Sequence, residues 1–202
     1  MKDKILGEKK LEKPEVPILA FTTSEAFTSW LEKNHKVSSG IWLQLFKKDS
    51  GVPTITYAEA LDVALCFGWI DGQKKPNDAL SWFQKFTPRR PKSIWSKKNR
   101  EHVERLEQSG LMQAAGRKEV EAAKADGRWE QAYDSPSNMV VPEDLLKLLA
   151  KYKKAEAFFK TLNKANLYAI AWRLQTAKKP ETREKRMKLI LEMLKKGEKF
   201  HP

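Results

Sequence analysis

The stretch from residue 56 to residue 99 constrains the fold of this chain more than any other part of the sequence. It opens with Thr56 and, three residues later, Glu59, the pattern of a capping box. Each of these two side chains can accept a hydrogen bond from a backbone N–H that the start of a helix leaves free. An apolar run follows, and Gly68 ends it at the position where helices commonly turn left-handed. Because both faces of the run are apolar, the stretch predicts a central, buried helix.

Four short segments have the aromatic and β-branched composition that is typical of strands. They cover residues 18–21, 40–46, 69–72 and 79–86. The last of them should end at Pro88, because proline has no backbone N–H to donate to a neighbouring strand. Short strands are stable only when several pair with one another, so the sequence predicts a small sheet of three or four strands.

From Ser96 onward the apolar residues recur with the period of a helix. Ser96 and Asn163 precede two of these runs and can cap them, while Pro142 stands at the start of another. A further helix should run to about Lys33, where Thr22 could act as the cap and Glu25 as its capping-box partner. With this helix and the capped run at Thr56, the pattern indicates about seven helices. The sequence therefore predicts an α+β fold in which helices dominate.

Composition divides the chain into three parts. Residues 1–16 are charged and lack a regular apolar pattern, which predicts a flexible tail. Residues 17–138 form the expected α+β core domain, and residues 139–202 form a basic helical region. Residues 147–202 contain 16 Lys and Arg against 5 Asp and Glu, so most of the net charge of +13 lies there. This excess indicates an anionic partner or, alternatively, a solvated lysine-rich surface.

The sequence does not support several common kinds of site. The single cysteine, Cys66, lies in an apolar helical run, and the three histidines lack the spacing of metal ligands, so we expect neither a metal site nor a Cys-His nucleophile. The glycine-rich phosphate-binding patterns are absent, and we expect no cofactor. The first residues lack the apolar segment of a secretory signal, and no apolar run is long enough to cross a bilayer, which favours a cytoplasmic location.

A candidate ligand-binding site lies at two turns of the predicted sheet. If the strands that carry Trp69 and Trp82 pair, these turns come to neighbouring ends of the sheet. Asp71 in one turn could then hold one guanidinium of the arginine pair in the other, and leave the second for a carboxylate or phosphate. The alternative is an internal Asp–Arg bridge among core tryptophans. We assign no catalytic residue; the candidate ligand-binding residues are Trp69, Asp71, Trp82, Arg89, Arg90, Trp95 and Asn99.

A second candidate site, for anions, lies in the C-terminal region at Lys179, Arg183 and Arg186. The two arginines are three residues apart and therefore share a helix face, on which they could bind phosphate groups together. The alternative is that these charges support the helix itself, because Glu181 and Glu184 are each followed four residues later by a lysine.

The chain also contains an ordered set of longer motifs. They are residues 57–72 (YAEALDVALCFGWIDG), 86–99 (FTPRRPKSIWSKKN), 110–129 and 177–186 (AKKPETREKR). This set, which extends from about Trp30 to Gly197, resembles the YdeI/OmpD-associated (bacteriocin-protection) family. The resemblance implies a bacterial protein linked to resistance against bacteriocins and cationic antimicrobial peptides, in some members associated with an outer-membrane porin. It supplies no catalytic residue.

These observations together predict a cytoplasmic, stress- or resistance-associated binding protein, rather than an enzyme, whose partner is an anionic small molecule or an acidic protein. A chain with a net charge of +13 repels cationic peptides, which argues against direct capture of an antimicrobial peptide. Two alternatives stay open. One is an enzyme that acts on a small molecule in the same cleft, and the other is a module that binds nucleic acid or a membrane surface through the basic C-terminal helices.

Overall fold

The structure is a computed structural model that describes residues 16–135 and 138–202. These residues form eight α-helices, one short 3-10 helix and one four-stranded sheet. The prediction of a helix-dominated α+β fold is therefore confirmed, with one helix more than expected. The flexible tail expected at residues 1–16 lies, except for Val16, outside the described residues.

The chain folds into two compact units that interleave along the sequence. The first unit comprises the described residues up to Pro91 together with Leu106–Glu119, and the second comprises Lys92–Arg105 together with Val120–Pro202. Two helices, α3 (Lys97–Gln108) and α4 (Ala114–Ala125), each have residues in both units. The boundaries that the sequence predicts, after residues 16 and 138, stay a prediction.

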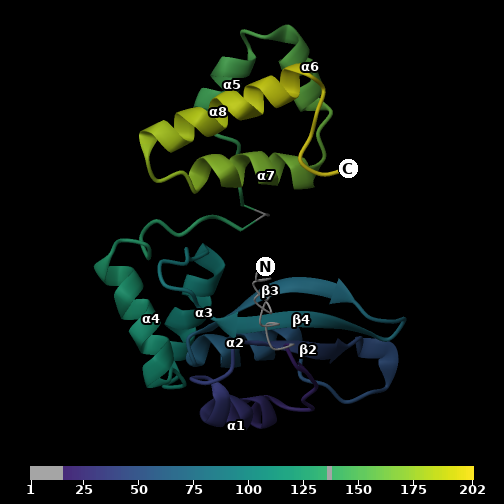
Figure 1. The fold of residues 1–202 in the computed structure, drawn as a ribbon, viewed down its shortest axis with the longest axis vertical. Coiled ribbons are helices and arrows are strands. Elements are labelled where there is room, and N and C mark those ends of the chain that lie inside the picture. The colour runs from purple at the N-terminus through teal and green to yellow at the C-terminus, as the bar shows by residue number, and fades with distance from the viewer. Residues whose placement is uncertain (1–15, 136–137) are drawn as a thin grey trace, which may run out of the picture. The chain divides into compact units, whose positions relative to one another are not determined.

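The first unit is built on a four-stranded sheet (Figure 1). Its strands are β1 (Ile18–Leu19), β2 (Ile41–Phe46), β3 (Trp69–Pro76) and β4 (Ser81–Pro88). They lie in the order β1-β2-β4-β3, in which the β1–β2 pair is parallel and the other pairs are antiparallel. Strand β4 ends at Pro88, as expected. Strand β3 is longer than predicted because its pairing with β4 resumes after an irregularity between Asp71 and Lys74.

The core of the first unit lies between this sheet and helices α1 (Ser24–Asn34) and α2 (Tyr57–Cys66). The ring of Phe27 on α1 lies 5.9 Å from that of Phe86 on β4, centroid to centroid. The inward residues alternate along β2 with half-buried ones, as the two-residue period of a strand requires. The fully buried residues of β2 are Ile41, Leu43 and Leu45.

The local signals at the helix ends are mostly confirmed. Thr56 Oγ1 accepts a hydrogen bond from the Glu59 N–H at 3.2 Å, and the Glu59 carboxylate accepts one from the Thr56 N–H at 2.8 Å. Gly68, just after α2, is left-handed with φ +73°. At α1 the cap is Thr23, one residue after the threonine that the sequence pattern indicates, and it accepts from the Ala26 N–H at 3.3 Å.

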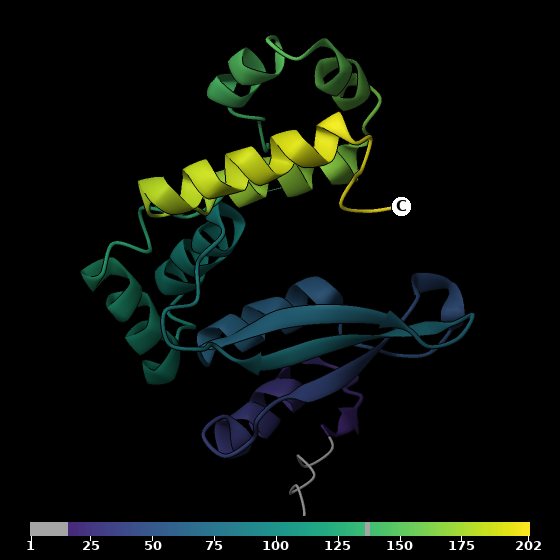
Figure 2. The same cartoon turned by 45° about the horizontal axis from the view of Figure 1, so that its top comes forward.

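The second unit contains four helices that share one core (Figure 2). They are α5 (Glu143–Leu149), α6 (Lys153–Lys160), α7 (Lys164–Gln175) and α8 (Pro180–Lys195). Figure 1 shows α5 and α6 on one side of α8 and α7 on the other. The buried cluster that joins these helices consists of Leu145, Leu149, Ala155, Ile170, Leu174, Ile190, Leu191 and Leu194.

Among the described residues, none of the helices combines the length and the apolar composition that spanning a membrane requires.

Candidate functional site

The first unit contains a pocket of about 710 Å³ beside the turn that joins α2 to β3. Four segments contribute its walls: the C-terminal end of α1, the turn after α2, the end of β4 and the first turns of α4. Two residues of the predicted site, Trp69 and Arg89, line this pocket. The volume lies in the range of pockets that bind small molecules.

The turn is shaped by Gly68, whose positive φ of +73° other residues rarely adopt. Its N–H donates to the Leu65 carbonyl at 3.1 Å, and its own carbonyl accepts from the Arg89 N–H at 3.0 Å. A Cβ at this position would lie 3.0 Å from the Ala115 carbonyl oxygen. The glycine therefore lets the turn, the end of β4 and the start of α4 approach one another closely.

Helix α4 is held against the end of α2 by backbone contacts. The Gln113 N–H donates to the Cys66 carbonyl at 3.1 Å. At Gly116 the approach is closer still, since a Cβ there would lie 2.3 Å from the Cys66 carbonyl oxygen. Ala114 and Ala115, the first residues of α4, consequently line the pocket. The N-terminal end of a helix carries a partial positive charge, so this wall favours an anion.

An aromatic group and a nearly buried guanidinium form the opposite wall. Trp69 is 1% exposed, and its indole N–H donates to the His35 carbonyl at 3.2 Å. Its ring meets that of Trp30 edge-on at 5.8 Å. Arg89 is 7% exposed, which is unusual for an arginine. The wall is therefore rigid and carries a positive charge in surroundings that are largely shielded from water.

The rim of the pocket carries charges of both signs. Lys36 on the segment after α1 and Lys118 on α4 are exposed cations, and Glu32 and Glu119 are the carboxylates of the lining. With Arg89, the lining contains one more lysine or arginine than carboxylates, before the positive end of α4 is considered. The arrangement suits a small anion that also has a polar or cationic group.

The aspartate of the predicted site contacts a tyrosine of α2. Asp71 accepts a hydrogen bond from the Tyr57 hydroxyl at 2.7 Å. Burial, together with the hydrogen bond to Asp71 and its negative charge, raises the pKa of Tyr57. This contact ties β3 to α2. Arg90, the second arginine, is exposed to solvent.

Trp82 lies on β4 away from the larger pocket. The Lys74 ammonium stands 4.8 Å from the centroid of its ring. Trp82 and Tyr57 line a separate pocket of about 480 Å³ in the same unit. The sheet pairing that the site hypothesis needed is thus present, but it places Trp69 and Trp82 in different pockets.

Trp95 and Asn99 belong to the second unit. Trp95 is 1% exposed, and its ring meets that of Trp129 edge-on at 5.0 Å. The Asn99 N–H donates to Ser96 Oγ at 3.1 Å, so Ser96 caps α3 as predicted. In this unit Trp95 belongs to a core, and its ligand-binding role stays a prediction.

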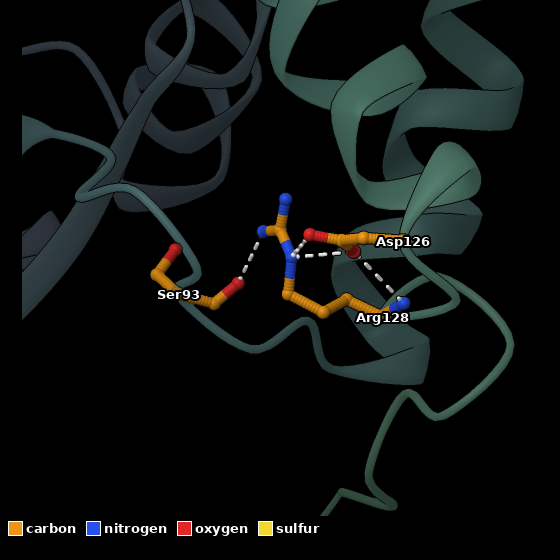
Figure 3. A network of polar contacts seen from close by, with 3 residues as sticks. All are labelled: Ser93, Asp126 and Arg128. Carbon is orange, nitrogen blue, oxygen red and sulfur yellow. Dashed lines mark hydrogen bonds and ion pairs between the residues drawn. The ribbon is translucent and has the colours of Figure 1, made fainter.

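An arginine that the sequence reading missed organises the same region. Arg128 is 5% exposed; its Nε lies 2.7 Å from the Asp126 carboxylate and its Nη1 donates to the Ser93 carbonyl at 2.8 Å. Figure 3 shows the guanidinium between these two groups. The hydrogen bond from Arg128 lowers the pKa of Asp126. Arg128 thereby ties the segment that follows α4 to the segment that precedes α3.

The arginines of the predicted anion site in the C-terminal region bind groups of the protein itself. Arg183 forms two hydrogen bonds with the Asp144 carboxylate, at 2.5 and 3.1 Å. Arg186 donates to the Arg173 carbonyl at 2.6 Å and to the Thr176 hydroxyl at 3.2 Å. Lys179, which precedes α8, is exposed. Within the described residues, no group of three His, Cys, Asp or Glu side chains is placed to hold a metal ion.

Comparison with known families divides the chain in two. Residues 19–119 match the family described as a domain of unknown function, DUF8412. Residues 138–197 match the bacteriocin-protection, YdeI or OmpD-associated family. The chain belongs to the DUF8412 family, and its C-terminal region contains a bacteriocin-protection, YdeI or OmpD-associated domain. No curated protein and no solved structure matches it.

The resemblance to the bacteriocin-protection family is therefore confirmed, and the match lies in the C-terminal helices. All residues that line the 710 Å³ pocket lie within the DUF8412 match, as do the motifs at residues 57–72 and 86–99. The Arg183–Asp144 and Arg186 contacts lie within the bacteriocin-protection match. The candidate pocket thus belongs to the DUF8412 domain.

Proposed function

We propose that the DUF8412 domain binds a small anion, a carboxylate or phosphate compound, in the pocket between Trp69, Arg89 and the start of α4. One observation carries this proposal: a nearly buried arginine and the first turn of a helix line the same cavity of about 710 Å³. Carboxylates and phosphates match the planar fork of a guanidinium, and charge-assisted hydrogen bonds of this kind are about twice as strong as neutral ones.

The surroundings of Arg89 favour binding over simple surface attraction. An electrostatic contact strengthens as water is excluded, and Arg89 is only 7% exposed. Lys36 and Lys118 at the rim add long-range attraction for an incoming anion. Glu32 and Glu119 would then select ligands that carry a donor or cationic group as well.

We place this activity in a cytoplasmic bacterial protein that contributes to stress or bacteriocin resistance. The net charge of +13 disfavours direct contact with a cationic peptide, so protection would follow from binding an anionic compound. Deletion of the gene in a host strain, followed by bacteriocin challenge and cell fractionation, tests the role and the location. Unchanged sensitivity, or protein found outside the cytoplasm, would contradict this part of the proposal.

A thermal-shift screen tests the binding itself. We expect compounds from a panel of small di- and tricarboxylates and phosphomonoesters to raise the melting temperature, because a ligand at about 100 times its Kd stabilises the folded state by about 2.7 kcal/mol. Isothermal titration should confirm one site per chain. A panel with no compound that shifts the melting temperature would contradict the proposal.

Two substitutions locate the site. Arg89→Lys keeps the charge but removes the fork, and we expect it to weaken binding about tenfold or more. Lys118→Glu reverses one rim charge and should weaken binding about fivefold. Lys164→Glu makes the same charge change at an exposed lysine of the second unit and serves as the matched control. Equal affinity in all three variants would place the ligand elsewhere.

A further inference from the structure

The sheet of the first unit has a second face, opposite the core, that carries aromatic rings. The pairing register places Ile18 beside Trp42, Trp42 opposite Lys85, and Phe83 opposite Lys75, so these five residues share one face. Ile18 is 57% exposed, and Trp42 and Phe83 are partly exposed. We call these five residues the outer sheet face.

Lysines and rings alternate on this face. The Lys75 ammonium lies 4.4 Å, and the Lys85 ammonium 5.4 Å, from the centroid of the Trp42 ring. The two lysines come from β3 and β4, and the ring comes from β2, so the arrangement runs across three strands. Contacts between a lysine and an exposed ring are weak, so these lysines can turn towards a stronger anion at little cost.

We propose that the outer sheet face binds single-stranded nucleic acid. Bases stack on the rings of Trp42 and Phe83, and Lys75 and Lys85 pair with the phosphates between them. Trp42 and Phe83 are diagonal neighbours on adjacent strands, about 7–8 Å apart, so two bases of one strand can use both rings. A flat sheet with aromatic side chains is a recurrent platform for unpaired bases.

The chemistry of the face selects this partner over other anions. In a duplex the bases stack on one another and are not accessible to the rings of Trp42 and Phe83. A small anion without a base would gain no stacking energy from the two rings. This site uses no residue of the pocket at Trp69 and Arg89. It also differs from a charge-only contact through the basic C-terminal helices, because it depends on rings as well as lysines.

Fluorescence anisotropy with labelled oligothymidylate and oligouridylate of about 12 nucleotides tests the proposal. We expect binding that prefers the single strand over a duplex of the same length. Trp42→Leu and Phe83→Leu, which keep the charge and remove a ring, should each weaken binding about tenfold. The double substitution Lys75→Gln with Lys85→Gln should lower the slope of log affinity against log salt by about 1.4.

Tyr152→Leu is the matched control. Tyr152 is an exposed aromatic residue of the second unit, and the Lys195 ammonium lies 4.1 Å from its ring. The variant therefore removes a lysine–ring contact of the same kind at a position outside the sheet. We expect it to bind like the unchanged chain. The circular dichroism spectrum and melting temperature of each variant check its fold; should Trp42→Leu fail to fold, Phe83→Leu and the lysine variant decide.

Three results would overturn the proposal. They are no binding at low salt, equal affinity for duplex and single strand, and an affinity for the single strand that is unchanged in both Trp42→Leu and Phe83→Leu. Loss of binding on Lys178→Gln with Lys179→Gln, with the ring variants unaffected, would assign any nucleic-acid contact to the C-terminal helices.

Discussion

The two units of this chain use their positive charge in different ways. In the second unit, which holds most of the net charge, arginines bind groups of the protein: Arg183 binds Asp144, Arg186 binds the Arg173 carbonyl and Arg128 binds Asp126. In the first unit, Arg89 lines a cavity of about 710 Å³. The region with the larger charge excess is therefore the weaker candidate for an anion site built on arginines.

This difference shows that the number of charges along a sequence indicates how strongly a region attracts anions at long range. It says little about where an anion-binding site lies. A site needs a cation next to a cavity and shielded from water, because electrostatic contacts are stronger there. Arg89 meets that condition at 7% exposure, whereas Lys179 in the C-terminal region is exposed. Four predictions test whether the two units are as different as this comparison indicates.

The largest expected effect comes from Gly116→Ala in the first unit. The added Cβ would lie 2.3 Å from the Cys66 carbonyl oxygen and 2.7 Å from that of Leu65, and backbone atoms cannot move aside as side chains do. We expect a loss of about 3 kcal/mol in unfolding free energy, measured by urea titration, together with weaker ligand binding in the pocket.

Gly72→Ala is its control, since a Cβ there would meet Lys85 Cβ at an ordinary 3.7 Å. It should change the unfolding free energy by less than about 0.5 kcal/mol. If both alanine variants are equally stable, the close approach of α4 to α2 is not what shapes the pocket.

In the second unit, the largest effect should come from Asn166→Ala. Asn166 is 1% exposed; its Nδ2 donates to the His201 carbonyl at 3.2 Å, and its Oδ1 accepts from the His201 N–H at 3.0 Å. The substitution releases the C-terminal residues and leaves their polar groups without these partners. We expect a loss of about 2 kcal/mol, with Asn138→Ala, at an exposed position, near zero. An unchanged urea midpoint would contradict it.

Helix caps give a matched pair, one in each unit. Thr56 caps α2 in the first unit, and Asn163 caps α7 in the second by accepting from the Asn166 N–H at 3.0 Å. Each alanine variant should cost about 1 kcal/mol, and Thr56→Ser should restore most of the loss. If the units unfold in separate transitions, Thr56→Ala will shift the midpoint of the first unit's transition and Asn163→Ala that of the second unit's. A common shift would show that the units unfold together.

The smallest effect concerns acid. The hydrogen bond from Arg183 lowers the pKa of Asp144, and the hydrogen bond from Lys97 lowers that of Asp134. An aspartate whose folded pKa lies below its unfolded value of about 3.9 adds stability above that value and loses it as the pH falls through the folded pKa. Urea unfolding at pH 7 and below pH 4 should therefore show a loss of at most about 1 kcal/mol per pair, since each pair contains one side chain that is about half exposed, Asp144 or Lys97.

Asp144→Asn should remove its share of this pH dependence, and salt at about 1 M should reduce it. The second pair, in which the Lys97 ammonium lies 2.7 Å from Asp134, is in the same unit. The double variant Asp144→Asn with Asp134→Asn should therefore remove the contribution of both pairs to the pH dependence. Stability that rises towards low pH would contradict the sign of the argument.

Much of the fold could be predicted because its signals are local. The capping box at Thr56, the left-handed Gly68, the end of β4 at Pro88 and the cap at Ser96 each depend on residues within a few positions of one another. The pairing of β3 with β4 was also anticipated, since the two strands are close in sequence. The length of β3 was underestimated, because its second part is exposed and lacks apolar residues.

The site was predicted only in part. Trp69 and Arg89 line one pocket. Lys36 and Lys118 belong to no motif that indicates a site, and they reach the rim because the packing of α1 and α4 places them there. The partner of Asp71 is Tyr57, fourteen positions earlier, and no spacing rule indicates it. A sequence signal could have found Arg128, since Asp126 stands two residues before it.

By itself, the sequence determined most of the helix caps, the α+β class and the family of the C-terminal helices. These features depend on the hydrogen bonds that the backbone groups at helix ends require and on the spacing of apolar residues. Both involve residues that are close to one another in the sequence. Only the tertiary structure decided which cations line a cavity and which carboxylates and carbonyls the arginines of the C-terminal region bind. That choice depends on the packing of segments far apart in the chain, because packing sets both the distance between charges and their access to water.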